Sequence, residues 1–352
     1  MDDATVSFFI HRIFAKKLKF YFQEELYELL SANNDIQYEA DIIYYRIVNE
    51  EKYGNWIREE NMTEVMTELE LWNHNAEPQL KAFEKQLEDR KLDLYNSYKF
   101  STSKQMDTKR RQIRSTERQI AQIHQKKQEF HANTLEGYAE GIKQEYIVTN
   151  TLYKNNKLVF DHNNKSEQSY NKFNQLIAEI NRHHITNNTY RDIANHDIWR
   201  SYWNASKNNI FEGAVSCWSE EQRNLVNTSQ MYDSVYSHPE CPDDEVIDDH
   251  DLLDGWMIKQ KRENKRKKKQ DTLDKSNKKL SKAGEVFLMG DDLESIKDIQ
   301  DMNSPFARQV FNQNMKQIHE QGSVDVVDMD TTRTVLVPEQ KAAAQLKVRK
   351  NF

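Results

Sequence analysis

The stretch from Trp199 to Trp256 constrains the fold most, because it holds four of the six tryptophans of a 352-residue chain. These four are Trp199, Trp203, Trp218 and Trp256. Large aromatic side chains are costly to leave in water, so we expect the main hydrophobic core here. Between them lie a run with helical spacing at residues 220–236, a proline-bounded turn and a dense acidic segment. We predict a Trp-rich helical core with an acidic segment over residues 134–256.

The low content of glycine and proline favours long helices. The chain has only 8 Gly and 5 Pro, the two residues that interrupt helices most strongly. An apolar share of 37% is low for a globular enzyme, whereas 16 Tyr, 15 Phe and 6 Trp are too many for a wholly disordered chain. The fold class is therefore predicted to be mainly α: an elongated helical protein with modest cores and a partly disordered C-terminal tail.

The number of cysteines and the hydropathy of the chain indicate the cellular compartment of the protein. Two cysteines cannot form a disulfide framework and fit a reducing environment. The first residues lack the basic-then-apolar pattern of a signal peptide, and no apolar run approaches the roughly 20 residues that a bilayer span needs. We expect a cytoplasmic protein without a membrane span.

Residues 1–76 are predicted to form an N-terminal helical region. Apolar residues recur with helical spacing through residues 4–30, and a second face is formed by Tyr38, Ile42, Tyr45 and Val48. Lysines at positions 16, 17 and 19 leave a membrane-surface helix as an alternative to ordinary helix packing.

Residues 77–133 are predicted to form a coiled-coil-like helical hairpin. Leu80, Phe83, Leu87 and Leu94 recur at intervals of three, four and seven, and a second seam follows a polar interruption at residues 101–107. That second seam consists of Ile113, Ile120, Ile123 and Phe130. Its flanking arginines, which include Arg110 and Arg114, are expected to cover the apolar seam with their long side chains. Oligomerisation could use the same hairpin.

Two local features stand out after residue 133. Gly137 and Gly141 lie four residues apart, which indicates close packing of one helix face. Asn pairs bracket the apolar run 158–160, which predicts one short strand between two turns.

The acidic segment, residues 237–254, is a candidate docking motif. Its carboxylates Asp248, Asp249, Asp251 and Asp254 stand beside Leu252, Leu253 and Trp256. The spacing fits neither a calcium loop nor a zinc pattern, so we predict no metal site. We expect the segment to dock by its apolar residues or to order a loop.

A basic run follows at residues 257–282, with twelve Lys or Arg against three acids. It is expected to be a linker or a helix, and Lys265, Arg266, Lys267, Lys268 and Lys269 form its densest part. Such a run can contact nucleic acid or an acidic partner, but it lacks the interleaved aromatic residues of a stacking platform. Nucleic-acid binding is therefore the less favoured reading. Residues 283–352 read as a weakly ordered tail.

Catalytic signatures are missing from the sequence. There is no phosphate-binding glycine loop, no nucleophile elbow, no HExxH and no paired CxxC. The nearest nuclease-like pattern, Asp330 followed by Glu339-Gln340-Lys341, is short enough to arise by chance. We predict a non-enzymatic protein without catalytic residues or a cofactor.

The middle of the chain, residues 40–270, resembles virion and tail morphogenesis proteins of large tailed bacteriophages, often labelled tail assembly chaperone or virion structural protein. The resemblance is carried by TLEGYAE at 134–140, IWRSYWNASK at 198–207, EEQRNLV at 220–226 and the run from MYDSVY at 231 through DDHDLLDGW at 248–256.

This resemblance implies an assembly factor that binds tail or tape-measure subunits in the host cytoplasm. The alternatives are a structural component of the virion neck, baseplate or tail, and a nucleic-acid-binding protein that acts through the basic run. The expected docking surface rests on its aromatic residues, with the four aspartates of the acidic segment supplying electrostatic specificity. The aromatic residues are Trp199, Trp203, Trp218, Tyr232, Tyr236 and Trp256.

Overall fold

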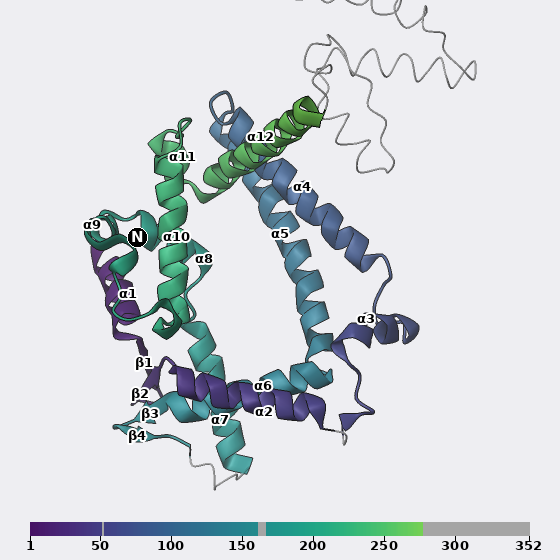
Figure 1. Ribbon diagram of the computed structural model, residues 1–352, viewed down its shortest axis with the longest axis vertical. Coiled ribbons are helices and arrows are strands. Elements are labelled where there is room, and N and C mark those ends of the chain that lie inside the picture. Colours follow the sequence, from purple (N-terminus) through teal and green to yellow (C-terminus); the bar gives the residue numbers. More distant parts are fainter. Residues whose placement is uncertain (51–52, 161–166, 277–352) are drawn as a thin grey trace, which may run out of the picture. The chain divides into compact units, whose positions relative to one another are not determined.

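The computed structural model describes residues 1–50, 53–160 and 167–276, and it confirms a mainly helical protein with a Trp-rich aromatic core (Figure 1). The chain divides into two compact units, Met1–Gln260 and Lys261–Phe352. The helices are α1 Asp3–Ala15, α2 Asn34–Asn49, α3 Glu59–Glu68, α4 Ala76–Ser97, α5 Ser103–His131, α6 Leu135–Thr151, α7 Glu167–Arg182, α8 Asn187–Asn195, α9 Asp197–Ser206, α10 Glu220–Tyr236, α11 Asp244–Asp248 and α12 His250–Ser276. Short 3₁₀ turns, η2 Lys207–Asn209 and η3 Val215–Cys217, follow α9. The strands are β1 Lys17–Phe22, β2 Glu25–Leu30, β3 Leu152–Lys154 and β4 Lys157–Leu158.

The prediction of helix through residues 4–30 is wrong after Ala15. Helix α1 ends at Lys16, which adopts a left-handed conformation with φ 53°, and a β-hairpin follows. Gln23 and Glu24 form its two-residue turn with φ values of 51° and 63°, the conformation that lets two twisted strands pair. Strand β1 buries Leu18 and Phe20 in alternation, so a period of two competes with the helical period in this segment.

The sheet joins segments far apart in the sequence. Its four strands lie in the order β1-β2-β3-β4, all antiparallel, with Leu29 of β2 opposite Leu152 of β3. The predicted strand at residues 158–160 is present only in part, because pairing begins at Lys157 and stops at Leu158. Its partner β3, which the sequence pattern did not indicate, follows the end of α6 directly. A separate small core consists of Leu18, Phe20, Tyr27 and Leu152 of the sheet together with Leu176 of α7.

The helical hairpin is present and consists of α4 and α5. The two helices run antiparallel, since Glu77 pairs with Lys127 near one end and Asp93 pairs with Lys109 near the other. Thr102 and Gln105 form a capping box that begins α5 within the predicted polar interruption. Of the predicted seam residues, Leu80, Leu94 and Ile113 are buried and the others are partly buried.

The two glycines of α6 differ in their surroundings. A Cβ atom on Gly137 would lie 2.0 Å from the carbonyl oxygen of His131, so the chain passes closely there. Nothing lies within 4 Å of the same position on Gly141, so the expectation of close packing is wrong for that residue. Helix α2 packs along α6, where Asp41 pairs with Lys143 at 2.9 Å (Figure 1).

The main core combines α1, the α4–α5 hairpin and every helix from α8 to α12 within the first unit. Its fully buried residues include Val6 and Ile13 of α1, Leu94 of α4, Ile113 of α5 and Trp199 of α9. Among the described residues no helix is long and apolar enough to cross a membrane. The tail expected at residues 283–352, with its nuclease-like pattern at Asp330, lies outside the described residues.

Candidate functional site

The last part of the acidic segment forms the start of helix α12. The Oδ1 atom of Asp249 accepts hydrogen bonds of 3.0 Å from the backbone N–H groups of Asp251 and Leu252. These N–H groups have no partner inside a helix, so an aspartate at this position starts and stabilises the first turn. The position of every later side chain in the segment follows from this cap.

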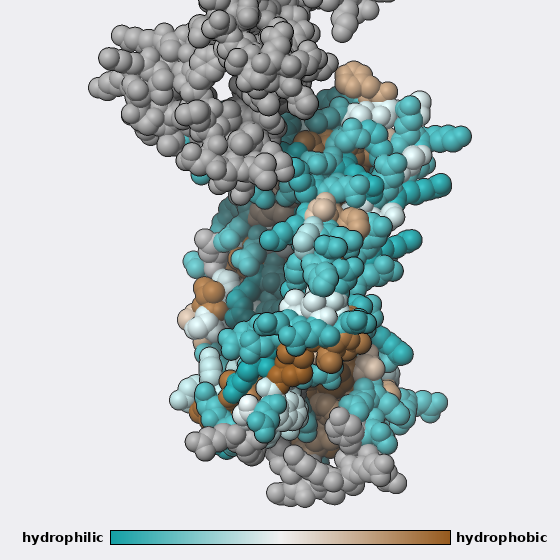
Figure 2. All heavy atoms as spheres, turned by 90° about the vertical axis from the view of Figure 1, so that its right-hand side faces the viewer, coloured by the Kyte–Doolittle hydropathy of each residue, from teal (hydrophilic) through white to brown (hydrophobic). Residues whose placement is uncertain are grey.

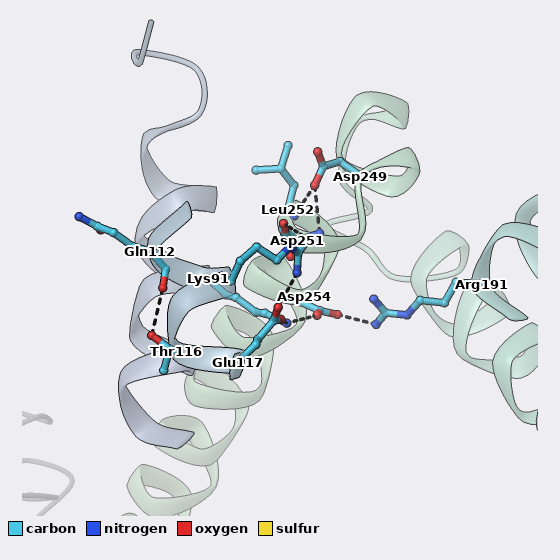
Figure 3. Close-up of polar contacts among 10 residues, drawn as sticks. Lys91, Gln112, Thr116, Glu117, Arg191, Asp249, Asp251, Leu252 and Asp254 are labelled. Atoms are coloured by element: carbon cyan, nitrogen blue, oxygen red, sulfur yellow. Dashed lines mark hydrogen bonds and ion pairs between the residues drawn. The ribbon is translucent and has the colours of Figure 1, made fainter. Parts of the chain in front are cut away.

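The carboxylates of the segment meet cations of the helical hairpin. Asp249 accepts a hydrogen bond of 2.6 Å from Arg110, and Asp251 accepts one of 2.8 Å from Arg114. Arg114 also pairs with Glu117 one turn along α5, at 2.7 Å. Figure 3 shows Asp249 and Asp251 at the start of α12, with Glu117 on the neighbouring helix α5.

Asp254 joins three helices. Its Oδ2 atom accepts a hydrogen bond of 2.8 Å from Lys91 of α4, and its Oδ1 atom accepts one from Arg191 of α8 (Figure 3). Lys91 also lies 3.4 Å from Glu117, which continues the chain of charges into α5. We call this set, Lys91, Arg110, Arg114, Glu117, Arg191, Asp249, Asp251 and Asp254, the ion-pair network.

Burial affects the two inner aspartates in opposite ways. Burial raises the pKa of Asp251, and the nearby Arg114 and Lys91 offset this only in part. Burial would also raise the pKa of Asp254, but Lys91 and Arg191 outweigh it and the pKa is lowered. The network therefore holds Asp254 firmly ionised between two cations.

The apolar residues of the segment dock inside the molecule. Leu252, Leu253 and Trp256 are buried in the main core. Gly255 lies directly against α4, because a Cβ atom there would be 2.3 Å from the carbonyl oxygen of Lys91. Within the chain, the segment fastens α12 to α4, α5 and α8.

The aromatic residues predicted to support docking lie mostly in the core. Trp199, Trp203, Trp218, Tyr232 and Trp256 are all buried, so they can support a surface but do not form one. The indole N–H of Trp199 donates to Ser229, and that of Trp203 donates to Asp233, each at 2.8 Å. Burial raises the pKa of Tyr232 to about 12.

Two of the predicted docking residues remain exposed at the surface. Tyr236 is 43% exposed, and its hydroxyl donates to Asn195 at 2.6 Å. Asp248 is exposed and accepts a hydrogen bond of 2.9 Å from the same Asn195 side chain. This pair lies near the C-terminal end of α10 and is the most exposed part of the predicted docking set.

The basic run belongs to helix α12. Lys265, Arg266, Lys267 and Lys268 are exposed, whereas the side chain of Lys269 lies outside the described residues. These residues fall in the second unit, which begins at Lys261.

A groove lies between α4 and α5 near the base of the hairpin, with a volume of about 310 Å³. We call it the hairpin groove; its lining combines four apolar residues with one asparagine, three glutamines and one lysine, namely Trp72, Asn73, Ala76, Gln79, Phe83, Gln119, Gln122, Ile123 and Lys126. The indole N–H of Trp72 is buried without a hydrogen-bond partner among the described residues. Leu69 and Leu71, just before Trp72, are 58% and 50% exposed.

Sequence reasoning missed the cationic partners of the acidic segment. Arg110 and Arg114 were expected only to cover an apolar seam, and Lys91 and Arg191 carried no signal. One signal was present: Arg110 and Arg114 lie one turn apart, which matches two carboxylates at the start of a crossing helix.

The described arrangement is suited to ordering and holding helices. Within the described part of the chain, no group of three or more His, Cys, Asp or Glu residues could hold a metal ion. Cys217 and Cys241 are exposed free thiols. Compared with known proteins, the chain matches no family model, no curated protein and no solved structure.

Proposed function

We propose that this protein is a non-enzymatic assembly factor of a large tailed bacteriophage, which holds tail or tape-measure subunits while the tail is built. The phage context is supported by the sequence resemblance over residues 40–270, which is strongest in about its last 60 residues. A holding role is supported by the shape of the hairpin and by its exposed apolar residues.

The observation that carries the holding role is the hairpin groove. Two antiparallel helices with an apolar seam leave a groove of the kind that accepts the apolar face of a third helix. Glutamine carboxamides in its wall can bond polar groups at the edge of such a helix. Leu69 and Leu71 extend the apolar surface, and Figure 2 shows hydrophobic residues gathered in the lower half of the face that carries α3.

Particle composition tests this function. Quantitative mass spectrometry of purified particles, beside the lysate of infected cells, is expected to find the protein abundant in the lysate and absent from particles. A fixed copy number in the particle would instead identify a structural component of the neck, baseplate or tail, which is the alternative function.

A surface variant links the holding role to the groove. In the full-length chain, Leu71→Glu is expected to reduce recovery of the tail subunit in pull-downs roughly tenfold, because it places a charge in an apolar contact. Phe100→Glu is the matched control, since Phe100 is 90% exposed at the tip of the hairpin. Equal loss with both variants would assign the binding to another surface.

A nucleic-acid-binding function rests on a different observation, the run of exposed cations Lys265, Arg266, Lys267 and Lys268 in α12. If the run contacts phosphates, changing Lys265, Arg266, Lys267, Lys268 and Lys269 to Ala should abolish DNA binding at low salt and flatten its salt dependence. Fluorescence anisotropy with labelled duplex at two salt concentrations measures this. Binding that survives the change, or that is absent from the parent protein at low salt, excludes this function.

A further inference from the structure

One face of helix α2 is apolar and exposed. Tyr38, Ile42 and Tyr45 are 68%, 40% and 62% exposed, and Asn49 continues the same line. The intervals of four, three and four are those of the a and d positions in a coiled coil. The opposite face of α2 packs on α6 around the buried Ala40, so the helix already has one partner. We call the exposed residues the α2 stripe.

In proteins, positions with this spacing are normally covered by another helix. Large side chains left in water along one helix face mark an interaction site more often than isolated exposed residues do. No element in the described part of the chain covers the α2 stripe, since all three large side chains are exposed there.

Charges beside the stripe indicate which partner fits. Asp35 lies in the first turn of α2 and Arg46 in the last turn. The two residues are eleven positions apart, which makes about three full turns, so both side chains lie on the same flank of the stripe. Neither makes an ion pair with another residue in the described ranges, and both are exposed. One flank is therefore negative at its start and positive at its end.

We infer that the α2 stripe binds the same stripe of a second copy of this chain, with the two α2 helices antiparallel. In a twofold-symmetric antiparallel pair, equivalent flanks of the two helices meet. An axis between Asp41 and Ile42 places Tyr38 opposite Tyr45 of the second copy. It also brings Asp35 to within about 3 Å, along the helix axis, of the level of Arg46 of that copy.

Other arrangements fit the charges less well. A parallel pair would place the two Asp35 side chains at one level on opposite sides of the interface, and the two Arg46 side chains likewise, so Asp35 could not meet Arg46 of the second copy. In the antiparallel pair the two Asp41 residues approach near the axis, but each is already neutralised by Lys143 of its own chain at 2.9 Å. The inference does not depend on the proposed function, because it concerns a different surface from the hairpin groove.

Charge reversal tests the pairing. In the full-length protein, Asp35→Arg alone and Arg46→Asp alone should each raise the dissociation constant of the dimer roughly tenfold, because each places like charges together. The double variant restores opposite charges and should return the constant to that of the parent. Sedimentation equilibrium over a concentration series measures all four proteins.

The double variant separates association from helix stability. Asp35 and Arg46 also suit the helix dipole of their own chain, so both reversals should lower thermal stability and their effects should add. Recovery of association together with loss of thermal stability identifies a contact between chains. A parent that stays monomeric throughout the series, or a double variant that associates no better than the singles, overturns the inference.

Cross-linking checks the geometry. In a background with Cys217→Ser and Cys241→Ser, Ile42→Cys should form a disulfide between chains on mild oxidation, since position 42 lies beside the axis. Gln37→Cys, on the same helix but off the stripe, is the matched control and should not. Cross-linking of position 37 in place of position 42 contradicts the antiparallel stripe contact.

Discussion

Replacing Gly255 by alanine is expected to lower the free energy of unfolding by about 3 kcal/mol. Helix α12 lies so close to α4 at this residue that a Cβ atom would be 2.3 Å from the carbonyl oxygen of Lys91 and 2.6 Å from the Cβ atom of Tyr95. Backbone cannot move aside as a flexible side chain can, so the helices must separate. Separation would pull Leu252 and Trp256 partly out of the core and lengthen the contacts of the ion-pair network.

Gly141→Ala is the matched control for this prediction. Gly141 also lies inside a helix, but nothing approaches its Cβ position within 4 Å. Alanine should therefore stabilise the protein by up to about 1 kcal/mol through its better helix propensity. Urea unfolding followed by tryptophan fluorescence measures both variants. Equal effects of the two substitutions would mean that α12 does not lie against α4 as described.

Asp254→Asn is expected to cost about 2 kcal/mol of stability, because it leaves Lys91 and Arg191 facing each other without a compensating charge. Asparagine keeps the shape and one acceptor oxygen, so the loss is smaller than for removal of the side chain. Asp248→Asn in the same acidic segment is the control. Asp248 is exposed and bonds only to Asn195 in the described hydrogen-bond pattern, so its variant should stay within about 0.5 kcal/mol of the parent.

The same pair of variants predicts a dependence on pH. The pKa of Asp254 in the folded state lies below its usual value of 3.8, so its carboxylate contributes stability above that value. This contribution is lost as the pH falls through the lowered pKa. The difference between parent and Asp254→Asn should be full at pH 7 and shrink below about pH 4. A difference that stays constant down to pH 2.5 would show that the charge of Asp254 is not its source.

Helices were the part of the fold that the sequence predicted best. The run expected at residues 220–236 is α10 with the same bounds, and the turn of the hairpin, residues 98–102, overlaps the start of the polar interruption predicted at 101–107. Both segments combine a regular apolar spacing with cap residues such as Ser219 and Thr102, so local and long-range preferences agree. Where local and long-range preferences agree, a single sequence is sufficient to predict the helix.

The β-hairpin at residues 17–30 could not be predicted in this way. Its turn residues, Gln23 and Glu24, are not the Asn or Gly that usually mark such turns. The period of two in β1 extends over only a few residues, and β2 becomes an inner strand by pairing with β3, more than 120 residues further along the chain. Pairing over that distance leaves no mark on local periodicity.

The contacts of the candidate site were likewise only partly predictable from local sequence patterns. The acidic segment and its apolar neighbours were identified, but their partners Lys91, Arg110 and Arg191 come from three other helices. A tryptophan-rich stretch likewise predicts a core without saying which rings reach the surface. Burial of Trp199 and exposure of Tyr236 depend on the packing of α9 against α10, which no local pattern encodes.

The long separation between partners in the main core governs when this chain can fold during synthesis. Arg12 of α1 bonds to the carbonyl oxygen of His183 and pairs with Glu221, and Ile13 accepts a hydrogen bond from Gln222. At elongation rates of about 5–20 residues per second, α1 leaves the ribosome roughly 10–45 s before α10 is complete. Until α8, α9 and α10 have been made, the apolar face of α1 lacks these partners. A chain released before α8 is made therefore begins with a helix whose apolar face has none of these contacts.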